Sequence, residues 1–98
     1  MILMSLNFSW DDKKNTINKT KHKISFEEAE TAFYDERAKI ISDPDHSQEE
    51  ERFILLGMDF KLKLLVVCHT FLEKVGIIRI ISARKATKKE RNKYTGEE

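Results

Sequence analysis

Two apolar runs in the second half of the chain constrain its fold most strongly. Residues 64–70 read LLVVCHT and residues 77–84 read IIRIISAR, and a short loop that ends in Gly76 separates them. Runs rich in β-branched residues and joined by a short glycine-containing loop are typical of a β-hairpin. Both are apolar at consecutive positions, as in central strands covered on both faces. The second run also carries Arg79 and Arg84. A buried cation is costly without a partner, so each arginine should either pair with a carboxylate or line a cleft that receives an anion.

Helix-start signals predict three helices. Asp11 is a suitable N-cap for a helix over residues 12–22, although that segment is polar, has Ile17 as its one apolar residue and would need tertiary support. Capping-box patterns predict the other two helices, over residues 26–34 and 87–94. The residues of these boxes are Ser25 with Glu28 and Thr87 with Glu90.

The remaining segments predict strands. Residues 6–10 alternate as a short first strand, and residues 38–42 and 52–58 precede the two long runs. The Asp-Pro-Asp-His-Ser sequence at 43–47 is turn chemistry. Four consecutive strands with short connections indicate an antiparallel meander. The chain is therefore expected to form one α+β domain over residues 1–98, with helices packed on an antiparallel sheet.

The near-neutral net charge of +1 conceals two halves of opposite sign. Residues 27–51 hold ten acids against Arg37 and Lys39, whereas residues 79–94 hold seven bases against Glu90 alone. Such asymmetry indicates nucleic acid on the basic side. The alternative is that both segments are simply solvated helix faces.

The chain has one cysteine, Cys68, and so cannot form an internal disulfide, which is typical of a reducing cytosol. The first six residues lack a basic signal-peptide region, and no apolar run reaches the roughly 18 residues of a membrane-spanning helix. We therefore expect a soluble, cytoplasmic protein without membrane association.

An ordered set of residues along nearly the whole chain resembles the BrnT family of bacterial ribonuclease toxins, which have a RelE-like fold. The set comprises Phe8, Trp10, Asp11, Lys14, Asn18, Lys21, His22, Ser25–Ala29, Phe33, Asp43, Pro44, His46, Ser47, Glu51–Phe53, Gly57, Leu65–Val67, His69, Thr70, Arg79–Arg84, Ala86, Thr87, Glu90, Arg91 and Tyr94. The family usually has glycine after the Lys-His pair, where this chain has Lys23. Glycine would suit a left-handed helix C-cap, so this turn is a point of departure from the family.

The resemblance implies an RNA-cleaving toxin that a ribbon-helix-helix antitoxin of the BrnA kind holds inactive. In that arrangement the antitoxin, and not this chain, reads the operator DNA. Metal-independent RNA cleavage needs a base for the 2′-hydroxyl, a cation for the phosphate and an acid for the leaving oxygen. Arg79 and Arg84 are the candidates for the phosphate, since the guanidinium fork matches its oxygens. Because positions 79 and 84 of an unbroken strand face opposite ways, one shared site requires a bulge or a strand end near Ser82.

The candidates for proton transfer are His69, Glu90 and His22. Each has a structural alternative: His69 as a satisfied histidine at a strand end, Glu90 as part of its capping box, and His22 as a cation at a helix C-terminus. Tyr94 would either stack on a base or pack the last helix on the sheet. The candidates for sequence-independent phosphate contacts are Lys85, Lys88, Lys89 and Lys93, whose alternative is a solvated helix face. His46 with Asp43 and Asp45 indicates a turn, so we expect neither a metal nor another cofactor.

Two functional hypotheses follow from these residues. The first is a metal-independent endoribonuclease toxin. The second is a non-catalytic subunit, derived from a toxin, that only docks an antitoxin or RNA.

Overall fold

The computed structural model describes residues 6–42 and 51–97. In chain order the elements are β1 (Asn7–Ser9), α1 (Asp12–His22), α2 (Phe26–Thr31), the 3₁₀ turn η1 (Ala32–Tyr34), β2 (Lys39–Ser42), β3 (Phe53–Met58), β4 (Leu64–Leu72), β5 (Ile77–Lys85) and α3 (Lys88–Thr95). The α+β class is confirmed, and every predicted helix and strand is present. Their bounds lie within about two residues of those expected, except that the helix predicted over residues 26–34 ends at Thr31 and continues as η1. The turn predicted at 43–47, with Asp43, Asp45 and His46, lies outside the described residues.

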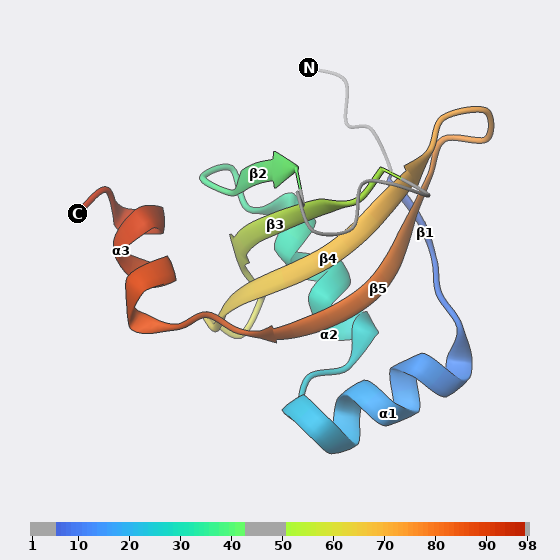
Figure 1. The fold of residues 1–98 in the computed structure, drawn as a ribbon, viewed down its shortest axis with the longest axis horizontal. Helices are drawn as coiled ribbons and strands as arrows, with labels where there is room; N and C mark the ends of the chain where they lie inside the picture. Colours follow the sequence, from blue (N-terminus) through green and yellow to red (C-terminus); the bar gives the residue numbers. More distant parts are fainter. Residues whose placement is uncertain (1–5, 43–50, 98) are drawn as a thin grey trace.

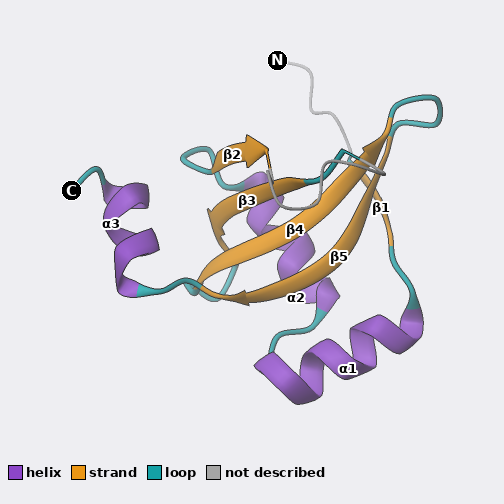
Figure 2. Ribbon diagram, in the orientation of Figure 1, coloured by secondary structure: helices purple, strands orange, loops and turns teal. Residues whose placement is uncertain are grey.

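The five strands form one sheet in the order β1-β5-β4-β3-β2 (Figures 1 and 2). Strands β2 to β5 make the predicted antiparallel meander. The sheet as a whole is mixed, because β1 pairs parallel to β5 at the far edge. A parallel pair requires a long crossover connection, and here the connection includes all the elements between β1 and β5.

Helices α1 and α2 and the η1 turn cover one face of the sheet, and α3 lies beyond its end (Figure 1). The buried core between the helices and the sheet contains Phe26 and Ala29 from α2 with Leu55, Val67 and Ile80 from the strands. The backbone approaches closely at Gly57, where a Cβ atom would lie 2.8 Å from the carbonyl oxygen of Ala32. Glycine at this position therefore lets η1 pack directly on β3.

Local caps fix the helix ends that the sequence predicts. Asp11 accepts hydrogen bonds from the backbone N–H groups of Lys13 and Lys14, and complete capping boxes open α2 at Ser25 and α3 at Thr87. At the end of α1, Lys23 adopts the left-handed conformation with φ of 62°. Lysine thus occupies the left-handed C-cap position that glycine would suit, at some cost in backbone strain.

The tertiary support for α1 is polar. Asn18 donates to the carbonyl oxygens of Ile24 and Ala83 and accepts from the N–H of Ala83, which ties the helix to β5. Asn15 is also buried, whereas Ile17 faces solvent with 62% of its surface exposed. None of the helices in residues 6–42 and 51–97 has the length and apolar character that spanning a lipid bilayer requires.

Candidate functional site

A β-bulge in β5 brings Arg79 and Arg84 to the same face of the sheet. Cys68 pairs with Ser82 and His69 pairs with Ile80, so Ile81 is an extra residue without a partner on β4. On one side of the bulge Arg79 pairs with Thr70, and on the other side Arg84 pairs with Val66. Because Thr70 and Val66 are four residues apart on β4, they and both arginines point to one side.

This side is the one that α1 and α2 leave uncovered, and we call it the open face. It is the face of β4 that carries Val66, Cys68 and Thr70, because Leu65 and Val67 point into the core on the other side. The expectation that β5 is covered on both faces is therefore wrong: Ile80 and Ala83 are buried, but Arg79 and Ser82 are exposed. Outward-pointing arginines in a strand that is apolar on its other face are better solvated than buried.

Arg84 is held by a carboxylate from its own basic segment. Its Nη1 and Nη2 atoms donate to Oε1 and Oε2 of Glu90 at 2.8 and 2.9 Å. Glu90 Oε1 also accepts the Thr87 N–H at 2.8 Å and so completes the α3 capping box. Hydrogen bonding from Arg84 lowers the pKa of Glu90 to about 2, and the pair raises the pKa of Arg84. So weak a base is a poor proton acceptor while the pair is intact.

Arg79 lies near the start of β5 and is exposed. Within the described part of the chain, its side chain has no carboxylate within ion-pair distance. The β4 partners of the two arginines, Thr70 and Val66, are four residues apart. The Cα atoms of Arg79 and Arg84 therefore lie roughly 13 Å apart. Thr70, directly opposite Arg79, is buried, and its hydroxyl has no hydrogen-bond partner among the residues that the structure describes.

His69 does not join the arginines. It points to the helix-covered side, where its ring lies edge-on to Phe33 with the centroids 4.8 Å apart. Its Nδ1 atom lies 3.1 Å from the carbonyl oxygen of Val67, a geometry in which Nδ1 carries the proton. Burial lowers the pKa of His69, so the ring is neutral. His69 is thus placed as a core histidine within β4, remote from the open face.

The other predicted residues divide between the open face and its surroundings. His22 lies in the last turn of α1, on the helix-covered side. Lys85 pairs with Leu65 and so also points to that side. Lys88, Lys89 and Lys93 are exposed on α3. Of these lysines, Lys93 lines a hollow on the open face.

Tyr94 anchors α3 to the domain. Its hydroxyl donates to Asp35 Oδ2 at 2.6 Å, and the same oxygen accepts the Met58 N–H at 2.8 Å. Burial opposes ionisation of Asp35, but its hydrogen bonds outweigh this effect and lower its pKa. Burial and the Asp35 carboxylate raise the pKa of Tyr94. The packing alternative for Tyr94 thus describes its contacts in this structure.

Lys39 is a site residue that the sequence analysis missed. Its ammonium group donates to the carbonyl oxygen of Lys93 at the end of α3, and its side chain lines the same hollow. The signal was the strand alternation of Lys39 and Ile41, which places both on one face of β2. No cluster of three or more histidine, cysteine or acidic side chains suited to a metal occurs in residues 6–42 and 51–97.

Comparison with known proteins identifies the family. The family model described as "Ribonuclease toxin, BrnT, of type II toxin-antitoxin system" matches residues 10–90. The chain belongs to the BrnT family. The crystal structure of the Brucella abortus ribonuclease toxin BrnT superposes with a TM-score of 0.64 at 22% sequence identity, covering 86% of this chain and all of that one. At this identity the likeness establishes the shared fold. Among curated proteins, no sequence matches at a significant level.

Membership of the BrnT family makes this chain the ribonuclease-toxin component of a type II toxin–antitoxin pair at the family level. An RNA target and an antitoxin partner follow from that membership.

Proposed function

We propose that the chain is a metal-independent endoribonuclease that binds RNA phosphates on the open face through Arg79 and Arg84. The observation that supports this most directly is the bulge at Ile81, which turns two guanidinium groups onto the face that α1 and α2 leave uncovered. Lys93 and the other exposed lysines of α3 extend the positive charge beyond the strand end. Phosphate contacts of this kind give affinity without sequence selection.

In this proposal an RNA phosphate replaces the Glu90 carboxylate as the hydrogen-bond acceptor of the Arg84 guanidinium group. The 2′-hydroxyl then attacks the neighbouring phosphorus, the bond to the 5′ oxygen breaks, and the two arginines stabilise the charge on the phosphate oxygens. The 2′ proton passes to a base, and an acid returns a proton to the leaving oxygen. Glu90 is the predicted proton-transfer residue that lies on the open face, and its pKa should rise once the phosphate has displaced it.

We also propose that the partner is a ribbon-helix-helix antitoxin, through which alone the complex contacts operator DNA, and that the free toxin arrests growth by cleaving cytoplasmic RNA. The bound antitoxin would then keep RNA from the open face. These finer assignments follow from the resemblance to the BrnT family.

The decisive experiment is RNA digestion by the purified chain, freed from any antitoxin, in the presence of a metal chelator. We expect wild type to cleave, and Arg79→Ala and Arg84→Ala to lose at least about a hundredfold in rate. The matched control is Arg37→Ala, which removes the same charge from an exposed side chain before β2 and keeps the hydrogen bond from the Arg37 backbone N–H to Asp35. In cells, Arg84→Ala should abolish growth inhibition while the folded protein still binds its antitoxin.

The ion pair between Arg84 and Glu90 favours one alternative function. Both terminal nitrogens of Arg84 are bonded to Glu90, and both described histidines of the candidate set lie off the open face. A non-catalytic subunit that only docks an antitoxin or RNA would have such a site. Intact RNA at high protein excess, with antitoxin binding retained, would establish this alternative and refute the endoribonuclease proposal.

A further inference from the structure

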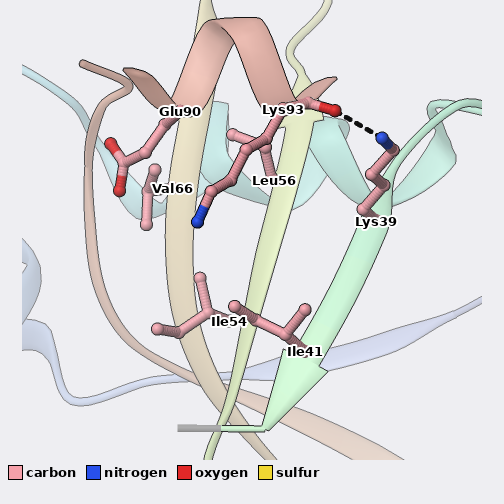
Figure 3. A pocket seen from close by; sticks show the side chains of 7 residues that line it. All are labelled: Lys39, Ile41, Ile54, Leu56, Val66, Glu90 and Lys93. Carbon is pink, nitrogen blue, oxygen red and sulfur yellow. Dashed lines mark hydrogen bonds between the residues drawn. The ribbon is translucent and has the colours of Figure 1, made fainter. Parts of the chain in front are cut away.

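A hollow of about 120 Å³ lies on the open face where the sheet meets α3. Its floor is made by four aliphatic side chains from β2, β3 and β4: Ile41, Ile54, Leu56 and Val66. Lys39, Lys93 and Glu90 form its rim. Figure 3 shows the Lys93 ammonium group reaching from α3 toward the floor, while the Glu90 carboxylate turns away from it.

The size of the hollow selects a small flat group. An apolar protein cavity of about 150 Å³ accommodates a benzene ring. The hollow, at about 120 Å³, is slightly smaller, but it is open at Ile41, which is 58% exposed. It can therefore take one six-membered ring packed on its floor, with the ring's exocyclic groups outside, and it is too small for a fused two-ring system. The aliphatic floor offers a surface on which the face of such a ring can pack.

The rim supplies hydrogen-bond donors. Lysine ammonium groups donate and cannot accept, and Lys93 has no carboxylate within ion-pair distance among the described residues. The Glu90 carboxylate points away from the floor (Figure 3), so it does not offer an acceptor to a ring that packs there. A ring that carries carbonyl oxygens therefore complements this rim better than one that presents an amino group.

The hollow also adjoins the phosphate site. Val66, which forms part of its floor, pairs directly with Arg84 across β4 and β5. Glu90 lines the hollow and bonds Arg84. A nucleotide whose phosphate is held by Arg84 would thus have its base within reach of the hollow.

We propose that this hollow is a base-recognition subsite for a pyrimidine nucleotide, with uracil, which has two ring carbonyls, as the best fit. The inference rests on the proposed function and deepens it, because it assigns the cleavage preference of the same face. Lys93 reads the carbonyl oxygens, and Lys39 holds the end of α3 so that Lys93 stays over the floor.

The test measures binding of single nucleotides, which does not require cleavage. Uridine, cytidine, adenosine and guanosine 3′-monophosphates are titrated into the wild-type chain and followed through the methyl NMR signals of Ile54, Leu56 and Val66. We expect the uridine nucleotide to bind at least about tenfold more tightly than either purine nucleotide and to shift these signals. Lys93→Met keeps the aliphatic stem but removes the donor, and should reduce the preference to below about twofold.

Two further variants guard the interpretation. Lys39→Met should weaken the preference through the position of α3, and would report on the subsite if Lys93→Met failed to fold. Lys74→Met removes an exposed charge at the β4–β5 turn, outside the hollow, and should leave nucleotide binding unchanged. We also expect the wild-type chain to cleave RNA preferentially beside uridines. The Lys93→Met variant should cleave without this base preference.

Several outcomes would separate the two proposals. RNA cleavage without base preference, unaltered in Lys93→Met, overturns the subsite and leaves the ribonuclease intact. Preferred uridine binding through Lys93 with uncleaved RNA supports the subsite and refutes the ribonuclease. If no nucleotide shifts the three methyl signals but the antitoxin does, the hollow belongs to the protein partner and the inference is wrong.

Discussion

Replacing Glu90 with glutamine tests how the fold restrains Arg84 before RNA arrives. The glutamine side chain keeps the shape of Glu90 and one acceptor for the Thr87 N–H, but it removes the charge and one of the two acceptors for Arg84. The structure predicts opposite effects on folding and on binding: the domain should become less stable, and RNA should bind more tightly. A glutamate that served only as a helix cap would give the first effect without the second.

The size of the effect on folding follows from the pKa of Glu90. Its value of about 2, against an ordinary 4.5, corresponds to about 3 kcal/mol of differential interaction. Solvent screening reduces this energy, because the side chains of Arg84 and Glu90 are 42% and 28% exposed. Glutamine also keeps part of the hydrogen bonding. We therefore expect Glu90→Gln to lower the free energy of unfolding by about 1 kcal/mol, or the melting temperature by about 4–8 °C.

The pH dependence has a definite sign. The folded-state pKa of Glu90 is lowered, so its contribution to stability is complete above about pH 4.5 and is lost as the pH falls toward 2. The stability difference between wild type and Glu90→Gln should therefore shrink over that range. Urea unfolding at several pH values measures it. Glu97→Gln is the matched control, since it makes the same charge change at the end of α3 without contacting Arg84.

Binding is measured with an RNA that carries a 2′-deoxy substitution at the cleavage site. Without its charged competitor, Arg84 should bind phosphate up to about tenfold more tightly, which corresponds to roughly 1.4 kcal/mol. Equal RNA affinity in wild type and Glu90→Gln would refute the exchange of Glu90 for phosphate. Cleavage, followed in parallel with unmodified RNA, reports separately on whether Glu90 also transfers a proton.

Three further predictions concern the core and α1. His69→Phe should retain RNA cleavage, and loss of cleavage in a folded variant would return His69 to the catalytic set. Wild type should lose stability below about pH 6.5, because His69 takes up a proton in the unfolded chain more readily than in the folded core. Urea unfolding of His69→Phe should lack this loss. Asn18→Ala should cost about 3 kcal/mol in denaturant unfolding, because it orphans both backbone groups of Ala83, and a cost below about 1 kcal/mol would contradict this. Lys23→Gly should raise the melting temperature by relieving about 0.5–1 kcal/mol of left-handed strain, whereas Lys23→Ala should not.

The parts of the fold that depend on local chemistry could be predicted from the sequence. The helix starts could be predicted because the N-caps Asp11, Ser25 and Thr87 bond to backbone N–H groups only two or three residues further along the chain. The meander followed from consecutive apolar runs with short connections. The parallel pairing of β1 with β5 could not be found in this way, because nothing in three residues specifies a partner about 70 positions away.

The site depended on which face of the sheet each residue occupies, and this was harder to predict. In an apolar run both faces look alike, so the sequence could not show that His69 points to the helices. The bulge at Ile81 was recognised only as a condition for a shared arginine site, since an extra residue in a strand has no signature in its own side chain. The α1 helix was ambiguous for a related reason: its inward residues are Asn15 and Asn18, and its one apolar residue faces solvent.

The sequence left open whether each arginine pairs with a carboxylate or lines a cleft that receives an anion. The acidic residues 27–51 were the richest source of such carboxylates. Instead, the partner of Arg84 is Glu90, the single acid of the basic segment, and the acidic half contributes Asp35 as an anchor for Tyr94. The carboxylate that caps α3 is thus the same one that occupies Arg84. In the proposed mechanism a phosphate takes Arg84 from Glu90 in the first turn of α3, and the next turn of α3 carries Lys93 at the hollow. We therefore expect a phosphate bound to Arg84 to change the position of Lys93 through this short helix.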